Sequence, residues 1–138
     1  MTKKSKIIID TNLWISFLLS KKINFIDHFL YIGRVQLIFS NELFEELMEV
    51  ISRPKLQKFF QKEDCELIFN IIEKYAVFIP VTSVVTECRD KKDVFLLSLA
   101  KDSNADYLLT GDKDLLVLEK IEGTQIITIS DFQTKCKV

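Results

Sequence analysis

The chain has 138 residues, of which 48% are hydrophobic, and its formal net charge at pH 7 is −1. This length and composition predict one globular domain covering 1–138, and the charge gives no sign of a strongly basic nucleic-acid-binding surface. The run Ile7–Ile9 is too short for a secretory signal and no run reaches the ~18 apolar residues of a membrane span, so we expect a cytoplasmic protein. The cysteines, odd in number and far apart, argue against a disulfide framework or a zinc site; they are Cys65, Cys88 and Cys136.

The first predicted element is a strand at Lys6–Ile9, because an unbroken apolar run is typical of a strand buried on both faces of a parallel sheet. It ends on a carboxylate, Asp10. The elements predicted after it are helices at 12–20 and 25–32, a strand at 34–39, a helix at 42–51, a helical stretch at 55–75 broken near 61–64, a strand at 76–81, a helix at 94–103, a strand at 106–109, a helix at 115–120, a strand at 125–129 and a helical turn from 130.

Several single residues indicate where these elements begin and end. Gly33 is expected as a left-handed C-cap, and Ser40 or Asn41 as the N-cap of the following helix. Pro80 marks the third strand as terminal or edge-like. Strands that alternate with helices predict an α/β fold, a three-layer sandwich in which helices flank a central, mainly parallel, five-stranded sheet.

Acidic residues gather at the predicted carboxyl ends of the strands. Asp10 follows the first strand, Asp112 and Asp114 follow the fourth, and Asp93 heads the apolar stripe of the helix before it, while Glu46 borders the core face of its helix. Each acid alone has an ordinary explanation as a turn residue, a helix cap or a solvated side chain. Ligands of open α/β sheets bind at this edge, and crowded carboxylates must protonate or bind a cation, which without a His or Cys cluster indicates Mg²⁺ or Mn²⁺.

These motifs carry a resemblance to a known family. They are Ile9-Asp10-Thr11-Asn12, Glu46-Leu47 followed by Arg53-Pro54-Lys55, Asp93 before an apolar helix, and Leu109-Thr110-Gly111-Asp112-Lys113-Asp114-Leu115. Over essentially its whole length the chain resembles the PIN-domain family, in particular the branch described as toxin components of toxin–antitoxin systems. The resemblance implies a PIN fold, Mg²⁺- or Mn²⁺-dependent endoribonuclease activity on RNA, frequent dimers and, in toxin systems, an antitoxin protein as partner.

The resemblance also assigns roles by position. Family members often carry Asp-Asn or Asp-Asp directly before the apolar helix, where this chain reads Arg89 to Val94; this leaves Asp90 as an alternative to Asp93, and we prefer Asp93 for its helical register. The matches are Asp10, Glu46, Asp93 and Asp112 to the acidic quartet, Asp114 to an accessory acid, and Asn12 and Thr110 to polar neighbours of the site.

The expected chemistry is metal-assisted hydrolysis of a phosphodiester. Asp10 is the candidate bridging ligand if two ions bind, and Glu46 is expected to reach a metal through water or to orient the nucleophile. Trp14 is expected in the core, because its neighbours are apolar, and His28 has no spaced partner. Cations expected to contact RNA phosphates are Lys113, Arg53, Lys55 and Lys92.

Two other functional classes stay open from the sequence. A Mg²⁺-dependent phosphoryl-transfer protein, receiver-like or phosphohydrolase-like, also places an aspartate after a strand, although it favours a second aspartate where this chain has Asn12. The second class is a non-catalytic module that binds a metal or a partner protein through the acidic crevice.

Overall fold

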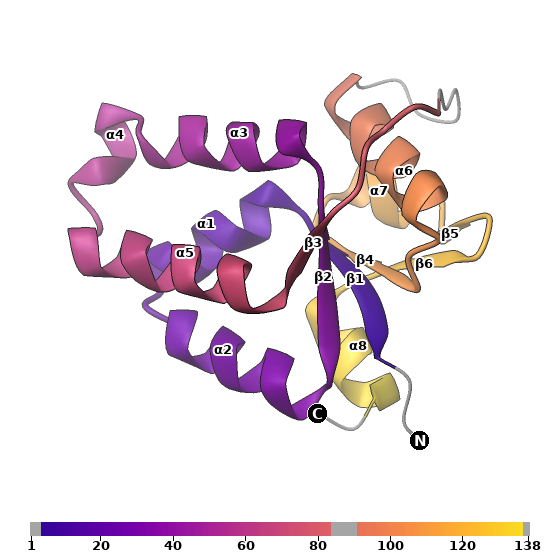
Figure 1. Cartoon of the computed structure of the whole chain (residues 1–138), viewed down its shortest axis with the longest axis horizontal. Helices are drawn as coiled ribbons and strands as arrows, with labels where there is room; N and C mark the ends of the chain where they lie inside the picture. Colours follow the sequence, from indigo (N-terminus) through magenta and orange to yellow (C-terminus); the bar gives the residue numbers. More distant parts are fainter. Residues whose placement is uncertain (1–3, 84–90, 137–138) are drawn as a thin grey trace.

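The computed structural model describes residues 4–83 and 91–136 (Figure 1). The elements are β1 (Ser5–Ile9), α1 (Thr11–Leu19), α2 (Ile23–Ile32), β2 (Val35–Phe39), α3 (Asn41–Ile51), α4 (Pro54–Gln57), α5 (Lys62–Tyr75), β3 (Ala76–Phe78), α6 (Lys91–Ser103), β4 (Tyr107–Leu109), α7 (Lys113–Leu116), β5 (Lys120–Ile121), β6 (Thr124–Ile127) and α8 (Ile129–Cys136).

A single mainly parallel sheet organises the fold. Its strand order is β3-β2-β1-β4-β6-β5, and among the described strands only the β5–β6 pair is antiparallel. Figure 1 shows α1, α2, α3 and α5 on one side of β1 and β2, with α6 and α7 on the other side. The α/β class and the flanked, mainly parallel sheet are therefore confirmed, and β3 lies at a sheet edge as Pro80 predicted.

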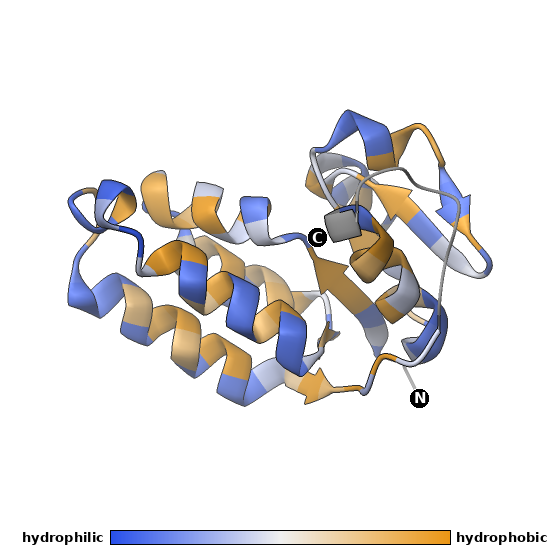
Figure 2. Ribbon diagram, turned by 90° about the horizontal axis from the view of Figure 1, so that it is seen from above, coloured by the Kyte–Doolittle hydropathy of each residue, from blue (hydrophilic) through white to orange (hydrophobic). Residues whose placement is uncertain are grey.

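The central strands are buried on both faces, as their apolar runs predicted. Ile7, Ile8 and Ile9 have almost no exposed surface, although successive side chains of a strand point to opposite faces. Figure 2 shows hydrophobic colours on the central part of the sheet and an alternation of hydrophobic and hydrophilic residues along the helices. Trp14 is fully buried, with its ring near those of Phe17 and Phe39, so its predicted place in the core is confirmed.

Within residues 4–83 and 91–136 the sheet has six strands, so the predicted number of five is wrong. The helix expected at 115–120 is shorter: α7 ends at Leu116, and β5 then pairs with β6 as a hairpin. Glu119 and Glu122 adopt left-handed φ angles of 65° and 49°, which let the chain turn before and after β5. Glutamate is uncommon in that conformation, so the sequence carried no sign of the first turn and indicated the second only through Gly123.

The C-terminus of α2 also differs from the prediction. Gly33 is not a left-handed cap: its φ is −76°, and its N–H donates to the carbonyl of Phe29 as in a continuing helix. The left-handed residue is Arg34, with φ of 52°, directly before β2. The N-cap of α3 is Ser40, one of the two predicted residues, and its hydroxyl accepts the N–H of Leu43 at 3.1 Å.

The break predicted in the helical stretch 55–75 separates α4 from α5. Pro54 opens α4 at a position where its missing N–H costs nothing, and Gln61 and Asp64 form a capping box at the start of α5. Among the described residues, every helix is too short or too polar to cross a membrane.

Candidate metal-dependent active site

The site begins where β1 and β4 end side by side. Ile9 is the register partner of Leu109, and the N–H of Asp10 donates to the carbonyl of Leu109 at 3.1 Å. This pairing places Asp10, 7% exposed, beside Thr110, which has no exposed surface. The Thr110 hydroxyl donates to Asp10 Oδ2 at 2.8 Å, and the N–H of Asn12 donates to Asp10 Oδ1 at 3.3 Å.

The same threonine hydroxyl connects Asp10 to the acids of α7. The N–H of Asp112 donates to Thr110 Oγ1 at 3.0 Å, so this one oxygen is both donor and acceptor. Asp112 is the N-cap of α7, where its Oδ1 accepts the N–H of Asp114 at 2.9 Å. A continuous chain of hydrogen bonds therefore fixes Asp10, Asp112 and Asp114 relative to the carboxyl ends of β1 and β4.

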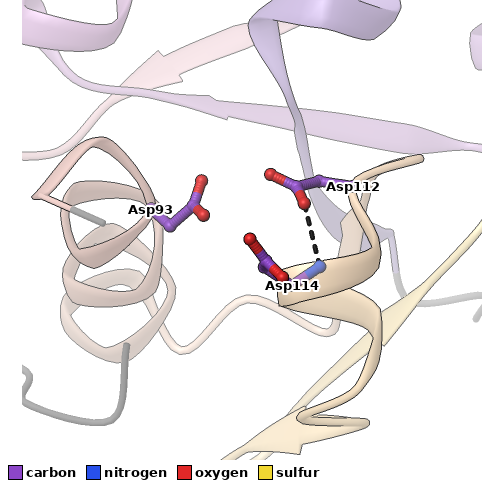
Figure 3. A group of neighbouring side chains, drawn as sticks. All are labelled: Asp93, Asp112 and Asp114. Atoms are coloured by element: carbon purple, nitrogen blue, oxygen red, sulfur yellow. Dashed lines mark hydrogen bonds between the residues drawn. The ribbon is translucent and has the colours of Figure 1, made fainter. Parts of the chain in front are cut away.

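Three carboxylates from two helices converge at this edge. Asp93 lies in the first turn of α6 and is 6% exposed, and Figure 3 shows its side chain directed toward Asp112 and Asp114. One oxygen of each carboxylate lies within 4.8 Å of the oxygens of the other two. Oxygen ligands this close suit a hard divalent cation such as Mg²⁺ or Mn²⁺, so the chemistry of these residues fits a metal ion.

A cavity of about 280 Å³ adjoins these acids, and it brings together segments that are far apart in the sequence. On its α1–α3 side, the Thr11 hydroxyl donates to Glu46 Oε2 at 3.1 Å. The cavity is lined by Asp10, Thr11, Asn12, Glu46, Val50, Arg53, Asp93, Leu96 and Asp112.

Two charged groups of the cavity have shifted pKa values. Burial raises the pKa of the Asp10 carboxyl; hydrogen bonds from Thr110 and Asn12 oppose this shift, and the charge of Asp112 adds to it. Hydrogen bonds from Arg53 to Glu49, at 3.1 and 2.8 Å, together with the Glu49 charge, raise the pKa of Arg53. The cavity therefore combines a carboxyl whose ionised form is disfavoured with a guanidinium held in place.

Most of the residues predicted from the sequence meet at this cavity. The structure places Asp114 in the three-carboxylate group and Thr110 between Asp10 and Asp112. Thr11, which no prediction assigned, holds Glu46; its only sign in the sequence was its place beside Asp10. The predicted residues that line the cavity are Asp10, Asn12, Glu46, Arg53, Asp93 and Asp112.

Other predicted residues lie outside the cavity lining. Lys55, on α4, and Lys113, on α7, are exposed on the surface. Lys92 belongs to α6, but its side chain lies outside the described part of the structure. Asp90, the alternative to Asp93, is itself outside the described residues.

Comparisons with known proteins agree with this geometry. A family model described as PIN domain matches residues 6–114, a range that includes all five acids discussed above. The chain is also 30% identical over 118 residues to the uncharacterized protein MJ1680 of Methanocaldococcus jannaschii, covering 83% of this chain and 76% of that protein. No solved structure matches the chain. The chain belongs to the PIN-domain family, whose members have a nuclease-type fold and are generally metal-dependent nucleases.

Proposed function

We propose that this protein is a Mg²⁺- or Mn²⁺-dependent endoribonuclease that hydrolyses phosphodiester bonds of RNA. The observation that carries the proposal is the group formed by Asp93, Asp112 and Asp114, whose oxygens lie within 4.8 Å of one another beside a polar cavity. Membership of a family of generally metal-dependent nucleases gives this group a chemical purpose.

The carboxylates differ in what they would hold. Asp93, Asp112 and Asp114 would together hold a divalent ion, and Asp10, on the wall of the same cavity, would supply a further carboxylate ligand. When bound, a divalent ion would lower the pKa of a water molecule and stabilise the leaving oxyanion. Thr110 and Asn12 would orient the Asp10 carboxylate through the hydrogen bonds described above.

The opposite wall of the cavity would position the substrate and the nucleophile. Glu46 is oriented by the Thr11 hydroxyl and would hold the attacking water or accept its proton. Arg53 retains N–H groups beyond the two that it gives to Glu49, and these would bind a phosphate oxygen of the RNA. The cavity therefore contains both acidic and cationic groups suited to phosphodiester hydrolysis.

The biological setting that we propose is a toxin–antitoxin system. The support is the motif resemblance to the toxin branch of the family, carried by Asp10-Thr11-Asn12 and Thr110-Gly111-Asp112. In that setting the protein acts in the cytoplasm, binds an antitoxin protein that blocks the acidic cavity, and forms a dimer of its own chains.

The direct test is RNA cleavage by Asp93→Asn compared with Asp131→Asn. The same substitution removes an acid of the three-carboxylate group in one case and an exposed aspartate of α8 in the other. We expect Asp93→Asn to lower metal-dependent cleavage by about 100-fold or more, because it removes a charged ligand, and Asp131→Asn to keep wild-type activity. Circular dichroism would show that both variants are folded.

Two results would overturn the proposal. Equal cleavage by Asp93→Asn and the wild type, in preparations freed of contaminating ribonuclease, would show that the acidic group does not catalyse it. Mn²⁺ binding without cleavage of any RNA in a diverse pool would instead support a non-catalytic binding module.

A further inference from the structure

A short cationic segment follows α3. We call residues 53–62 the α4 segment; it contains α4 and the turn into α5. It has four cations and no acid in ten residues, whereas the whole chain has a net charge of −1. All four cations are exposed, and a polyanion could reach them: they are Arg53, Lys55, Lys58 and Lys62.

The α4 segment is continuous with the acidic cavity. Glu46, Val50 and Arg53 all line the cavity and follow one another at helical spacing, so the cavity wall runs along one face of α3 toward its C-terminus. Arg53 is also the N-cap of α4. Figure 1 shows α4 directly after the end of α3 that lies farthest from the sheet. A nucleic-acid strand that leaves the cavity past Arg53 therefore reaches α4.

An exposed aromatic ring lies among these cations. Phe59 is 55% exposed, whereas its neighbour Phe60 is 8% exposed and packs in the core. Burial of Phe60 anchors the turn and leaves the Phe59 ring outside. Lys58 Nζ lies 5.3 Å from the centroid of the Phe59 ring. An aromatic ring beside cations matches the alternation of bases and phosphates along a nucleic-acid strand.

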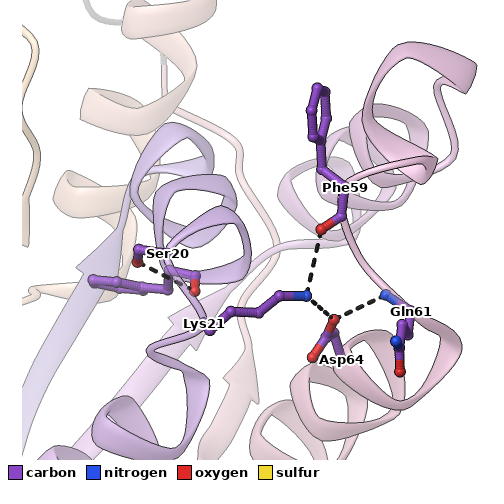
Figure 4. Close-up of polar contacts among 6 residues, drawn as sticks. Ser20, Lys21, Phe59, Gln61 and Asp64 are labelled. Atoms are coloured by element: carbon purple, nitrogen blue, oxygen red, sulfur yellow. Dashed lines mark hydrogen bonds and ion pairs between the residues drawn. The ribbon is translucent and has the colours of Figure 1, made fainter.

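The backbone that carries this ring is held by Lys21, in the turn between α1 and α2. Lys21 Nζ donates to the Phe59 carbonyl at 3.4 Å and to Asp64 Oδ2 at 2.8 Å, and Asp64 also accepts the N–H of Gln61 at 2.9 Å. Figure 4 shows the Phe59 ring directed away from this network. Because the network uses the Phe59 carbonyl and not the ring, the exposed part of the ring can stack on a base.

We propose that the α4 segment binds single-stranded RNA on its way to the acidic cavity, with one unpaired base stacked on Phe59 and phosphates on Arg53 and Lys58. The identity of the nucleic acid rests on the proposed function; the binding surface rests on the charge and the ring. A duplex is excluded as the preferred ligand, because its bases are already stacked on one another and cannot cover the ring.

The test is binding of a short unstructured RNA that contains 2-aminopurine, measured by anisotropy and fluorescence quenching with a chelator present. Full-length protein would be compared as wild type, Phe59→Ala, Phe59→Trp and Tyr31→Ala. Tyr31 is the matched control, since it is an exposed aromatic that lines a different hollow together with Lys4 and Arg34. Without a divalent ion, binding is measured separately from cleavage.

We expect Phe59→Ala to weaken binding of single-stranded RNA about tenfold, which is ~1.4 kcal/mol, and to abolish most of the quenching. Phe59→Trp should restore both, and Tyr31→Ala should change neither. Lys58→Gln should reduce the slope of log K against log salt by about 0.7, the contribution of one phosphate on a single strand. Duplex RNA of the same length should bind more weakly, with no effect of Phe59→Ala.

Three outcomes would overturn this inference. Unchanged affinity and quenching in Phe59→Ala would show that no base stacks there, even if the wild type cleaves RNA and the proposed function stands. An equal loss in Tyr31→Ala would show a nonspecific effect of removing aromatics. If Phe59→Ala weakened the binding of polyglutamate as much as the binding of RNA, the segment would be a surface for acidic proteins instead. Conversely, quenched binding that depends on Phe59, in a protein that cleaves nothing, would support the surface and refute the proposed nuclease.

Discussion

Replacing Thr110 with valine would test whether one buried hydroxyl holds the site together. Thr110 has no exposed surface; its hydroxyl donates to Asp10 at 2.8 Å and accepts the N–H of Asp112 at 3.0 Å. Valine keeps nearly the same shape and removes both hydrogen bonds. Thr110→Ser is the matched control, because it keeps the hydroxyl and removes only a methyl group.

The expected loss of stability follows from these two hydrogen bonds. A hydrogen bond to a charged group contributes about 1.5–3 kcal/mol, and the loss of an acceptor for the Asp112 N–H adds about 1 kcal/mol. Removal of one buried methyl group by serine costs about 1 kcal/mol. The free energy of unfolding of the valine variant should therefore be about 1.5–3 kcal/mol below that of the serine variant at neutral pH.

The pH dependence gives the prediction a second, independent part. Burial raises the pKa of Asp10 above its ordinary 3.8, and the Thr110 hydrogen bond opposes this, so valine raises the folded-state pKa further. A raised folded pKa contributes stability that is present below the unfolded pKa and is lost as pH rises through the folded pKa. In the valine variant this loss of stability continues to a higher pH. The difference in free energy of unfolding between the wild type and the valine variant is therefore small in acid and grows toward neutral pH.

Urea denaturation from about pH 3 to about pH 8, with a chelator present, would measure both parts. The chelator matters because a metal ion bound nearby would itself favour ionised Asp10. A valine variant as stable as the serine variant at neutral pH would refute the hydrogen-bond assignment. A deficit that is the same at every pH would refute the link to Asp10 ionisation.

Two further predictions concern residues away from the acids. Trp14 is fully buried, and its indole N–H has no hydrogen-bond partner among the described residues. Trp14→Phe should therefore lower the free energy of unfolding, measured by denaturation, by less than about 2 kcal/mol, whereas Trp14→Ala should lower it by about 3–5 kcal/mol. Equal losses in the two variants would contradict this. Asp102 accepts the N–H and hydroxyl of Ser83, which lower its pKa, so its stabilisation is present above pH 3.8 and lost as pH falls through the folded pKa. Asp102→Asn should therefore melt at a lower temperature than the wild type at pH 7 but not in strong acid, and equal melting at pH 7 would contradict this.

The position of Asp10 was predictable because two independent patterns agree there. The apolar run of Lys6–Ile9 required a strand buried on both faces, and parallel strands place their carboxyl ends at one sheet edge. The same rule placed Asp112 after the fourth strand. Helical register then brought Asp93 to the core side of α6, where the structure has it almost fully buried.

The features that the sequence did not predict depend on contacts between distant elements. Thr11 meets Glu46 only because α1 packs against α3, and spacing along the chain contains no sign of that packing. The extra strand β5 depends on left-handed glutamates, which local preference argues against. In both cases tertiary contacts decide a local conformation that the residue type alone does not favour.

The acid that is most evident in the sequence is not a member of the closest carboxylate group. Asp10 gives both its oxygens to hydrogen bonds, while Asp93, Asp112 and Asp114 bring oxygens within 4.8 Å of one another. Thr110 joins the two sets, because the same hydroxyl orients Asp10 and fixes the start of the turn that presents Asp112. The hydrogen bonds of Thr110 thus hold Asp10 and Asp112 at the carboxyl ends of β1 and β4, and a cation bound among the crowded carboxylates would relieve their mutual repulsion.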